Sequence, residues 1–208
     1  ATPLLRQARQ EPIPPTVLME HARFDRMLHV ADAVRLEREG QHEPALAAQQ
    51  AAVAISRRHG ALSLCTDLTQ LGLLLAAMGQ PERADAVFVE AGQWAGWLGL
   101  TVDQALATTQ RAGLAITQGA FQRGADLALR ALPGTENDYL EAALQLFVWT
   151  ARVRTGVWDA GALERIGRRL APVQPPDHEI VAAIEELERQ AMAEGRVLPR
   201  ALRVLARS

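Results

Sequence analysis

The sequence predicts an all-α protein, a right-handed solenoid of about five antiparallel helical hairpins. The first observation is a set of glycines, Gly40, Gly79, Gly119, Gly156 and Gly195, that lie 39, 40, 37 and 39 residues apart (79 − 40, 119 − 79, 156 − 119 and 195 − 156). The second is that apolar residues at helical spacing flank each of them, and the third is that no stretch alternates with period two. A fixed period of this length is typical of stacked helical hairpins.

Each hairpin is expected to turn at one of these glycines. Pro44 and Pro81 stand shortly after their turns, where the first turn of a helix tolerates a residue without an amide proton. The expected helix pairs are 16–39 with 44–59, 61–78 with 81–98, 102–118 with 121–132, 136–155 with 159–170, and 178–194 with 197–207.

The chain divides into three parts. Residues 1–15 form a lead-in with a short helix that Pro12, Pro14 and Pro15 end, because proline restricts the residue before it. Residues 16–171 form an array of four repeats. Residues 172–208 form a divergent fifth hairpin that we expect to act as the C-terminal cap.

Small residues stand in register on the two helices of the hairpins. Gly72 lies seven positions before Gly79, and the aromatic Phe88 follows on the next helix. Where two helices cross closely only a small side chain fits, and an aromatic ring can fill the space beside it. The small residues five positions after their turn glycine are Ala45, Ala84, Gly124 and Gly161.

The second repeat resembles the tetratricopeptide repeat (TPR) on Leu71-Gly72, Gly79, Ala84, Phe88 and Ala91. The period of 39 or 40 residues exceeds the about 34 of that family. In this respect the chain is similar to the longer repeats in the superhelical domains of bacterial transcription regulators. The resemblance implies a TPR-like solenoid in which the first helices of the hairpins line a concave groove.

The resemblance also implies which residues line that groove. They are small, apolar or hydroxyl-bearing, which favours an extended or helical apolar peptide over a terminal carboxylate as the ligand. The alternative is that these side chains are buried against neighbouring helices. The groove residues carried over by position are Val30, Val34, Arg38, Thr66, Thr69, Leu73, Leu106, Thr109, Thr117, Leu146, Thr150 and Arg154.

Composition argues against several other classes of protein. The net charge of −2 gives no field that would attract nucleic acid, so direct nucleic-acid binding is not expected. No run of about 18 apolar residues would cross a membrane. The single cysteine, Cys65, excludes an intrachain disulfide. The start of the sequence has no apolar signal-peptide core, and we expect a cytoplasmic protein.

No catalytic motif is present. The sequence has no HExxH pair, GxSxG elbow or glycine-rich phosphate loop, and we expect neither an enzyme nor a metal or cofactor. The interpretation is a non-enzymatic scaffold that binds a protein or peptide in an apolar groove. The alternative is the sensor or oligomerisation domain of a larger bacterial transcription regulator whose DNA-binding domain lies outside this chain. Self-association is compatible with both.

Overall fold

The computed structural model describes residues 15–60, 62–135, 137–173 and 177–206. Within these ranges the chain forms ten α-helices and one 3-10 turn and contains no strand, so the predicted all-α solenoid is confirmed. The short helix expected in the lead-in lies outside the described residues, which begin at Pro15.

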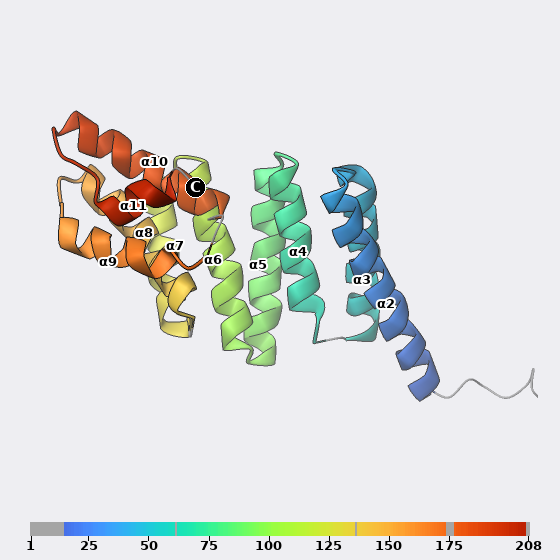
Figure 1. Ribbon diagram of the computed structural model, residues 1–208. Coiled ribbons are helices and arrows are strands. Elements are labelled where there is room, and N and C mark those ends of the chain that lie inside the picture. The colour runs from blue at the N-terminus through green and yellow to red at the C-terminus, as the bar shows by residue number, and fades with distance from the viewer. Residues whose placement is uncertain (1–14, 61, 136, 174–176, 207–208) are drawn as a thin grey trace, which may run out of the picture.

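The helices form antiparallel pairs that follow one another along the chain (Figure 1). The second helix of each of the first three pairs also packs against the first helix of the next pair. The pairs are α2 (Pro15–Arg38) with α3 (His42–His59), α4 (Leu64–Ala77) with α5 (Pro81–Leu98), α6 (Thr101–Thr117) with α7 (Phe121–Ala131), α8 (Asp138–Arg154) with α9 (Ala160–Leu170), and α10 (His178–Ala193) with α11 (Arg200–Leu205); the 3-10 turn η1 (Leu132–Gly134) follows α7.

Left-handed glycines make the turns within the hairpins. The five glycines predicted from the spacing all have positive φ, between 67° and 86°. After Gly40 the amide of Gln41 donates a hydrogen bond of 2.8 Å to the carbonyl of Leu36, and the same bond recurs after the other four. This Schellman pattern satisfies carbonyls that the end of a helix leaves without a partner. The paired helices are joined by three residues in each of the first three hairpins, by five in the fourth and by six in the fifth.

Two further left-handed glycines, which the sequence analysis did not predict, join successive hairpins. Gly60 ends α3 with φ 61°, and Gly99 ends α5 with φ 69°. Together with Gly40, Gly79 and Gly119 they place a left-handed residue every 19 or 20 positions (60 − 40, 79 − 60, 99 − 79 and 119 − 99). The structural unit between Gly40 and Gly119 is thus a single helix of 14 to 18 residues followed by a short turn.

Close helix contacts occur at most of the predicted small residues. A Cβ atom on Gly72 would lie 2.7 Å from Cδ1 of Phe88, and Phe88 is itself buried. A Cβ atom on Gly124 would lie 2.7 Å from Cδ1 of Ile116. Ala45, Ala84 and Ala91 are also buried. Side chains larger than these would push the paired helices apart.

The fourth hairpin departs from the predicted pattern, because Gly161 is not at a close helix contact. It is exposed, and a Cβ atom there would approach only Asp159 and the flexible end of Arg165. The facing position on the first helix, seven before Gly156, carries Trp149, whose bulk prevents the close crossing seen at Gly72. The close approach of α9 is instead at Gly167, where a Cβ atom would lie 2.8 Å from that of Ala201.

Two hydrophobic cores meet at α6. One surrounds Phe88 and draws its buried side chains from α3 to α6. The other surrounds Phe147 and draws its buried side chains from α6 to α11. No residue of α2 belongs to the buried part of either core among the described residues.

The two helical glycines Gly72 and Gly92 should respond oppositely to alanine. Gly72→Ala forces a Cβ against Phe88 and should lower the free energy of unfolding by about 1–3 kcal/mol. Gly92→Ala meets only Ala107, at 3.7 Å, and should raise it by up to about 1 kcal/mol through better helix propensity. Urea denaturation of both variants measures the difference, and equal effects would contradict the close contact at Gly72.

Candidate functional site: the face formed by the first helices

The first helices of four hairpins present an equivalent row of side chains. Each row consists of the four residues 13, 9, 6 and 2 positions before the turn glycine of its hairpin (for α4, 79 − 66, 79 − 70, 79 − 73 and 79 − 77). This spacing places the four residues on one side of the helix. We call this surface the first-helix face. Its residues are Met27, Ala31, Val34 and Arg38 on α2, Thr66, Gln70, Leu73 and Ala77 on α4, Leu106, Gln110, Gly113 and Thr117 on α6, and Ala143, Phe147, Thr150 and Arg154 on α8.

Exposure of this face falls steadily along the chain. All four residues on α2 are exposed, and on α4 only Leu73 is half-buried. On α6 three are half-buried and Gly113 is buried, and on α8 only Arg154 reaches solvent. The face is therefore open in the first two hairpins and closed in the fourth.

Helix α10 is what closes it. The fifth hairpin does not continue the stacking of the first four, because α10 packs chiefly on α6 and α8 while α11 packs on α9. A Cβ atom on Gly113 would lie 2.6 Å from Cγ of Glu179, so α10 fits tightly against α6 only because that position is glycine. Ile180 and Ala183 of α10 are buried with the second core.

Polar contacts hold α10 to α8. The Arg154 guanidinium donates to Oε1 of Glu186 at 2.6 Å, and Gln190 donates to the same oxygen at 3.0 Å. Glu186 is fully buried, and its other oxygen pairs with Arg189. At the start of α10 the Tyr139 hydroxyl donates to Oδ2 of Asp177 at 2.9 Å. A buried carboxylate without such partners would be strongly destabilising, so these bonds fix α10 in place.

Four of the predicted groove residues cannot line an open groove, because the structure buries them. Thr69 and Thr109 donate their hydroxyls to their own helices at 2.8 Å, and Leu146 is fully buried. These three lie ten positions before the turn glycine, one residue and about 100° away from the exposed row. Thr150 does lie in the row but is buried beneath α10 and bonds to the carbonyl of Phe147.

The remaining predicted groove residues are accessible to differing degrees. Those that are exposed are Val34, Arg38, Thr66 and Arg154, and those that are half-buried are Val30, Leu73, Leu106 and Thr117. The sequence analysis missed Ala31, Gln70 and Gln110, each nine positions before its turn. A spacing of four, three and four residues, counted on each helix from Met27, Thr66 or Leu106, includes all three.

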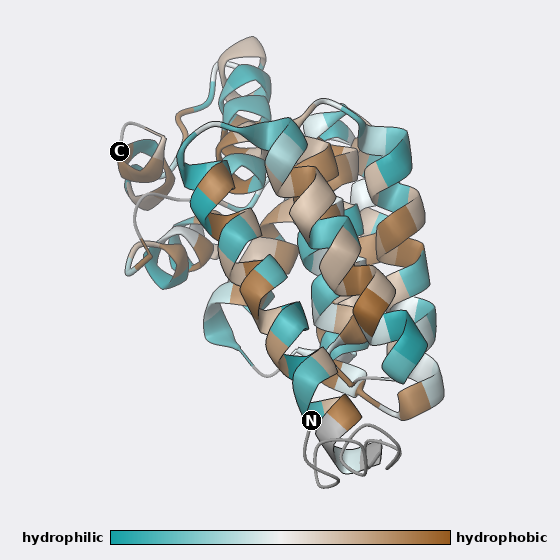
Figure 2. Cartoon of the chain, turned by 90° about the vertical axis from the view of Figure 1, so that its right-hand side faces the viewer, coloured by the Kyte–Doolittle hydropathy of each residue, from teal (hydrophilic) through white to brown (hydrophobic). Residues whose placement is uncertain are grey.

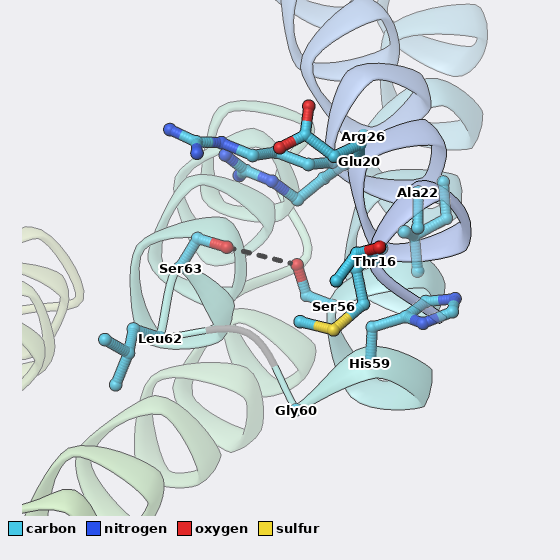
Figure 3. A pocket seen from close by; sticks show the side chains of 12 residues that line it. Thr16, Glu20, Ala22, Arg26, Ser56, His59, Gly60, Leu62 and Ser63 are labelled. Carbon is cyan, nitrogen blue, oxygen red and sulfur yellow. Dashed lines mark hydrogen bonds between the residues drawn. The ribbon is translucent and has the colours of Figure 1, made fainter. Parts of the chain in front are cut away.

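The structure also has a cleft of about 660 Å³ whose lining includes no residue of the first-helix face (Figure 3). It lies between the first turns of α2, the end of α3 and the segment before α4, and its walls include Met19, Ala22 and Leu62. With 24 residues α2 is much longer than α4, which has 14, so the start of α2 extends past α4 and leaves this space beside it.

A buried carboxylate next to this cleft joins three helices. Asp67 of α4 accepts a bond of 2.6 Å from Ser56 of α3 and one of 2.7 Å from Arg26 of α2. Its own carbonyl accepts 2.8 Å from Gln49 of α3. These bonds tie the first hairpin to the second where α2 and α4 otherwise make little contact.

Metal ligands and a reactive thiol were sought among the described residues. Among them, no group of three His, Cys, Asp or Glu side chains is placed to hold a metal ion. Cys65 is buried, and that burial raises the pKa of its thiol, which disfavours the nucleophilic thiolate. No helix in these ranges has the length and apolarity to cross a membrane.

Comparison with known proteins identifies the fold. The chain resembles the solved structure of a Podosopora anserina protein described as a kinesin light chain with nearly identical TPR-like repeats, with a TM-score of 0.53 at 16% identity. A variant of the same protein gives 0.54 at 16% identity; both alignments cover 84% of this chain and 87% of the other. No family model and no curated protein matches the sequence. The chain thus has a TPR-like helical-repeat fold.

Tyr139 reports whether α10 is in place. Burial and the hydrogen bond to Asp177 raise its pKa from 10.0 to about 12, so its contribution to stability is present below pH 10 and is lost as the pH rises towards 12. Because Tyr139 is the one tyrosine in the sequence, ultraviolet absorbance of tyrosinate follows it alone.

We expect a titration midpoint near pH 12 for the native protein and a lower one for Asp177→Asn, which removes the negative charge beside the phenol. A native midpoint at the ordinary value of 10.0 would mean that Tyr139 is solvated and that α10 does not rest on α8 as described.

Proposed function

We propose that this chain is a non-enzymatic scaffold that binds a protein or peptide on the open part of its first-helix face. The observation that carries the proposal is the gradient of exposure along that face: the row is open on α2 and α4, half-covered on α6 and buried on α8. A surface built by equivalent residues of successive hairpins and left uncovered at one end is suited to an elongated partner.

The chemistry of the rows on α4 and α6 supports a polypeptide ligand. Leu73 and Leu106 offer apolar contact, while the amides of Gln70 and Gln110 can each donate to and accept from a peptide backbone. Thr66 adds a hydroxyl. Such a mixture of apolar contact and neutral hydrogen-bonding groups suits a peptide strand or the apolar side of a helix.

The position of α10 supports the same proposal. It is a helix that lies on the first-helix face of α6 and α8, with a glutamate bonded to the arginine at the end of the α8 row. The equivalent surface on α2 and α4 is formed by residues at the same positions of their hairpins. A partner helix would find there a comparable arrangement of small and apolar side chains.

Charges placed on the open row test the proposal. We expect Thr66→Glu with Ala77→Glu to weaken partner binding at least tenfold, about 1.4 kcal/mol, because both residues are exposed and the added carboxylates would be desolvated by a bound partner. The matched control is Ala86→Glu with Gln93→Glu, which adds the same charge to exposed positions of α5.

The measurement is affinity capture from the native lysate, followed by titration of the captured partner against all three proteins. Circular dichroism verifies that the variants keep their helical content. Binding that survives on the α4 variant and is lost on the α5 variant would place the site elsewhere. A native chain that captures no partner would also contradict the proposal.

A further inference from the structure

Helix α2 carries apolar side chains on the side that faces away from the rest of the molecule. Phe24, Met27, Leu28 and Val34 are 61%, 53%, 50% and 39% exposed. The opposite side of α2 packs on α3 through small or apolar residues such as Ala22 and Ala33. Clustered exposed apolar side chains mark an interaction surface.

Nothing in the described chain covers this side of α2. The helix packs along α3 and makes no comparable contact with another helix. Its tie to α4 is the Arg26–Asp67 ion pair, on a different side from Phe24 and Leu28. In Figure 2, which views the molecule from this end, apolar brown segments alternate with teal ones along the front helices.

Two unpaired charges bracket the apolar side chains. Glu20 and Arg38 are 18 residues apart, five complete turns, so they lie on one line along α2 about 27 Å from each other. Both are exposed, and neither has an ion-pair partner among the residues that the structure describes. By contrast Arg35, on the neighbouring line, is already paired with Asp32 and Glu39. Along this line an acid stands at one end and a base at the other, with Phe24, Met27 and Leu28 beside it. Exposed Arg23 and Arg35 lie on its two margins, about 60° to either side.

Such a surface is complementary to itself in the antiparallel direction. A two-fold axis at residue 29, midway between Glu20 and Arg38, would set each Glu20 opposite the Arg38 of the other copy. The same axis would bring the row from Phe24 to Val34 of one copy against its equivalent. The chain contains a precedent for the contact. Arg154, which like Arg38 lies two positions before its turn glycine, donates to Glu186 of α10 at 2.6 Å.

We propose that two copies of this chain pair through α2, antiparallel about a two-fold axis, with Phe24, Met27 and Val34 in the contact and two Glu20–Arg38 ion pairs at its ends. This rests on the proposed function and narrows it, because Met27, Val34 and Arg38 belong to the open first-helix face and a second copy would occupy that part of it. The rows on α4 and α6 are left to a different partner.

Charge reversal tests the proposal, with the mass of the full chain measured by sedimentation velocity over a range of concentrations. The native chain should form a dimer with a micromolar dissociation constant. Glu20→Arg and Arg38→Glu should each weaken it at least tenfold, because each sets like charges opposite one another twice. The double variant Glu20→Arg with Arg38→Glu should restore the native dissociation constant, which a merely structural effect would not do.

Arg130→Glu is the matched control, since Arg130 is an exposed arginine on α7, in the third hairpin, and it should leave the dimer unchanged. A native chain that remains a monomer up to about 100 µM overturns the proposal. So does a dimer that either single reversal leaves intact, or one that the double variant fails to restore; residues 1–14 or another protein would then be the occupant of α2. A chain that captures its partner yet stays monomeric overturns the self-pairing and leaves the proposed function standing.

Discussion

The array depends on glycines with positive φ, which follow seven of the ten described helices (α2 to α6, α8 and α10). A glycine at that point lets the next amide bond back across the last turn, as Gln41 does to Leu36, and the following helix begins at once. In the first three hairpins only three residues separate the paired helices, which keeps the two helices side by side. The small residues on either side, Gly72 and Ala84 in the second hairpin, must then face each other closely, and Phe88 fills the remaining space.

The fifth hairpin shows what happens when these conditions change. In the fourth hairpin Trp149 occupies the position of a small residue, the helices no longer cross closely at Gly161, and α10 does not stack on α9. It lies instead across the first helices, where Gly113 makes room for Glu179 and Arg154 neutralises the buried Glu186. Helix α10 thus covers the first-helix face at the C-terminal end of the array, whereas the face stays open on α2 and α4 at the N-terminal end.

Much of this architecture could be predicted from the sequence, because it rests on local geometry. The five turn glycines, the helix pairs and the buried Ala45, Ala84 and Phe88 follow from spacing and size alone. Gly60 and Gly99 have positive φ like the five turn glycines. They fall on a period of about 20 residues, whereas the prediction used a period of about 40.

The exposure of the first-helix face could not be predicted in the same way. Thr150 occupies the position that Leu73 holds in the second hairpin, yet one is fully buried and the other is not, because the difference lies in where α10 packs. That packing joins residues far apart in the sequence, such as Gly113 and Glu179. The errors at Thr69, Thr109 and Leu146 are of another kind: a shift of one residue turns a helix by about 100° and exchanges an exposed position for a buried one.

Helix α10 covers one half of the first-helix face and leaves the other half open. Reactivity of single cysteines with a thiol reagent tests it most directly, since the native Cys65 is buried. Thr66→Cys on α4 should react at the rate of the unfolded chain, whereas Thr150→Cys on α8 should react at least about a hundredfold more slowly, through opening of α10. Equal rates at the two positions would contradict the account.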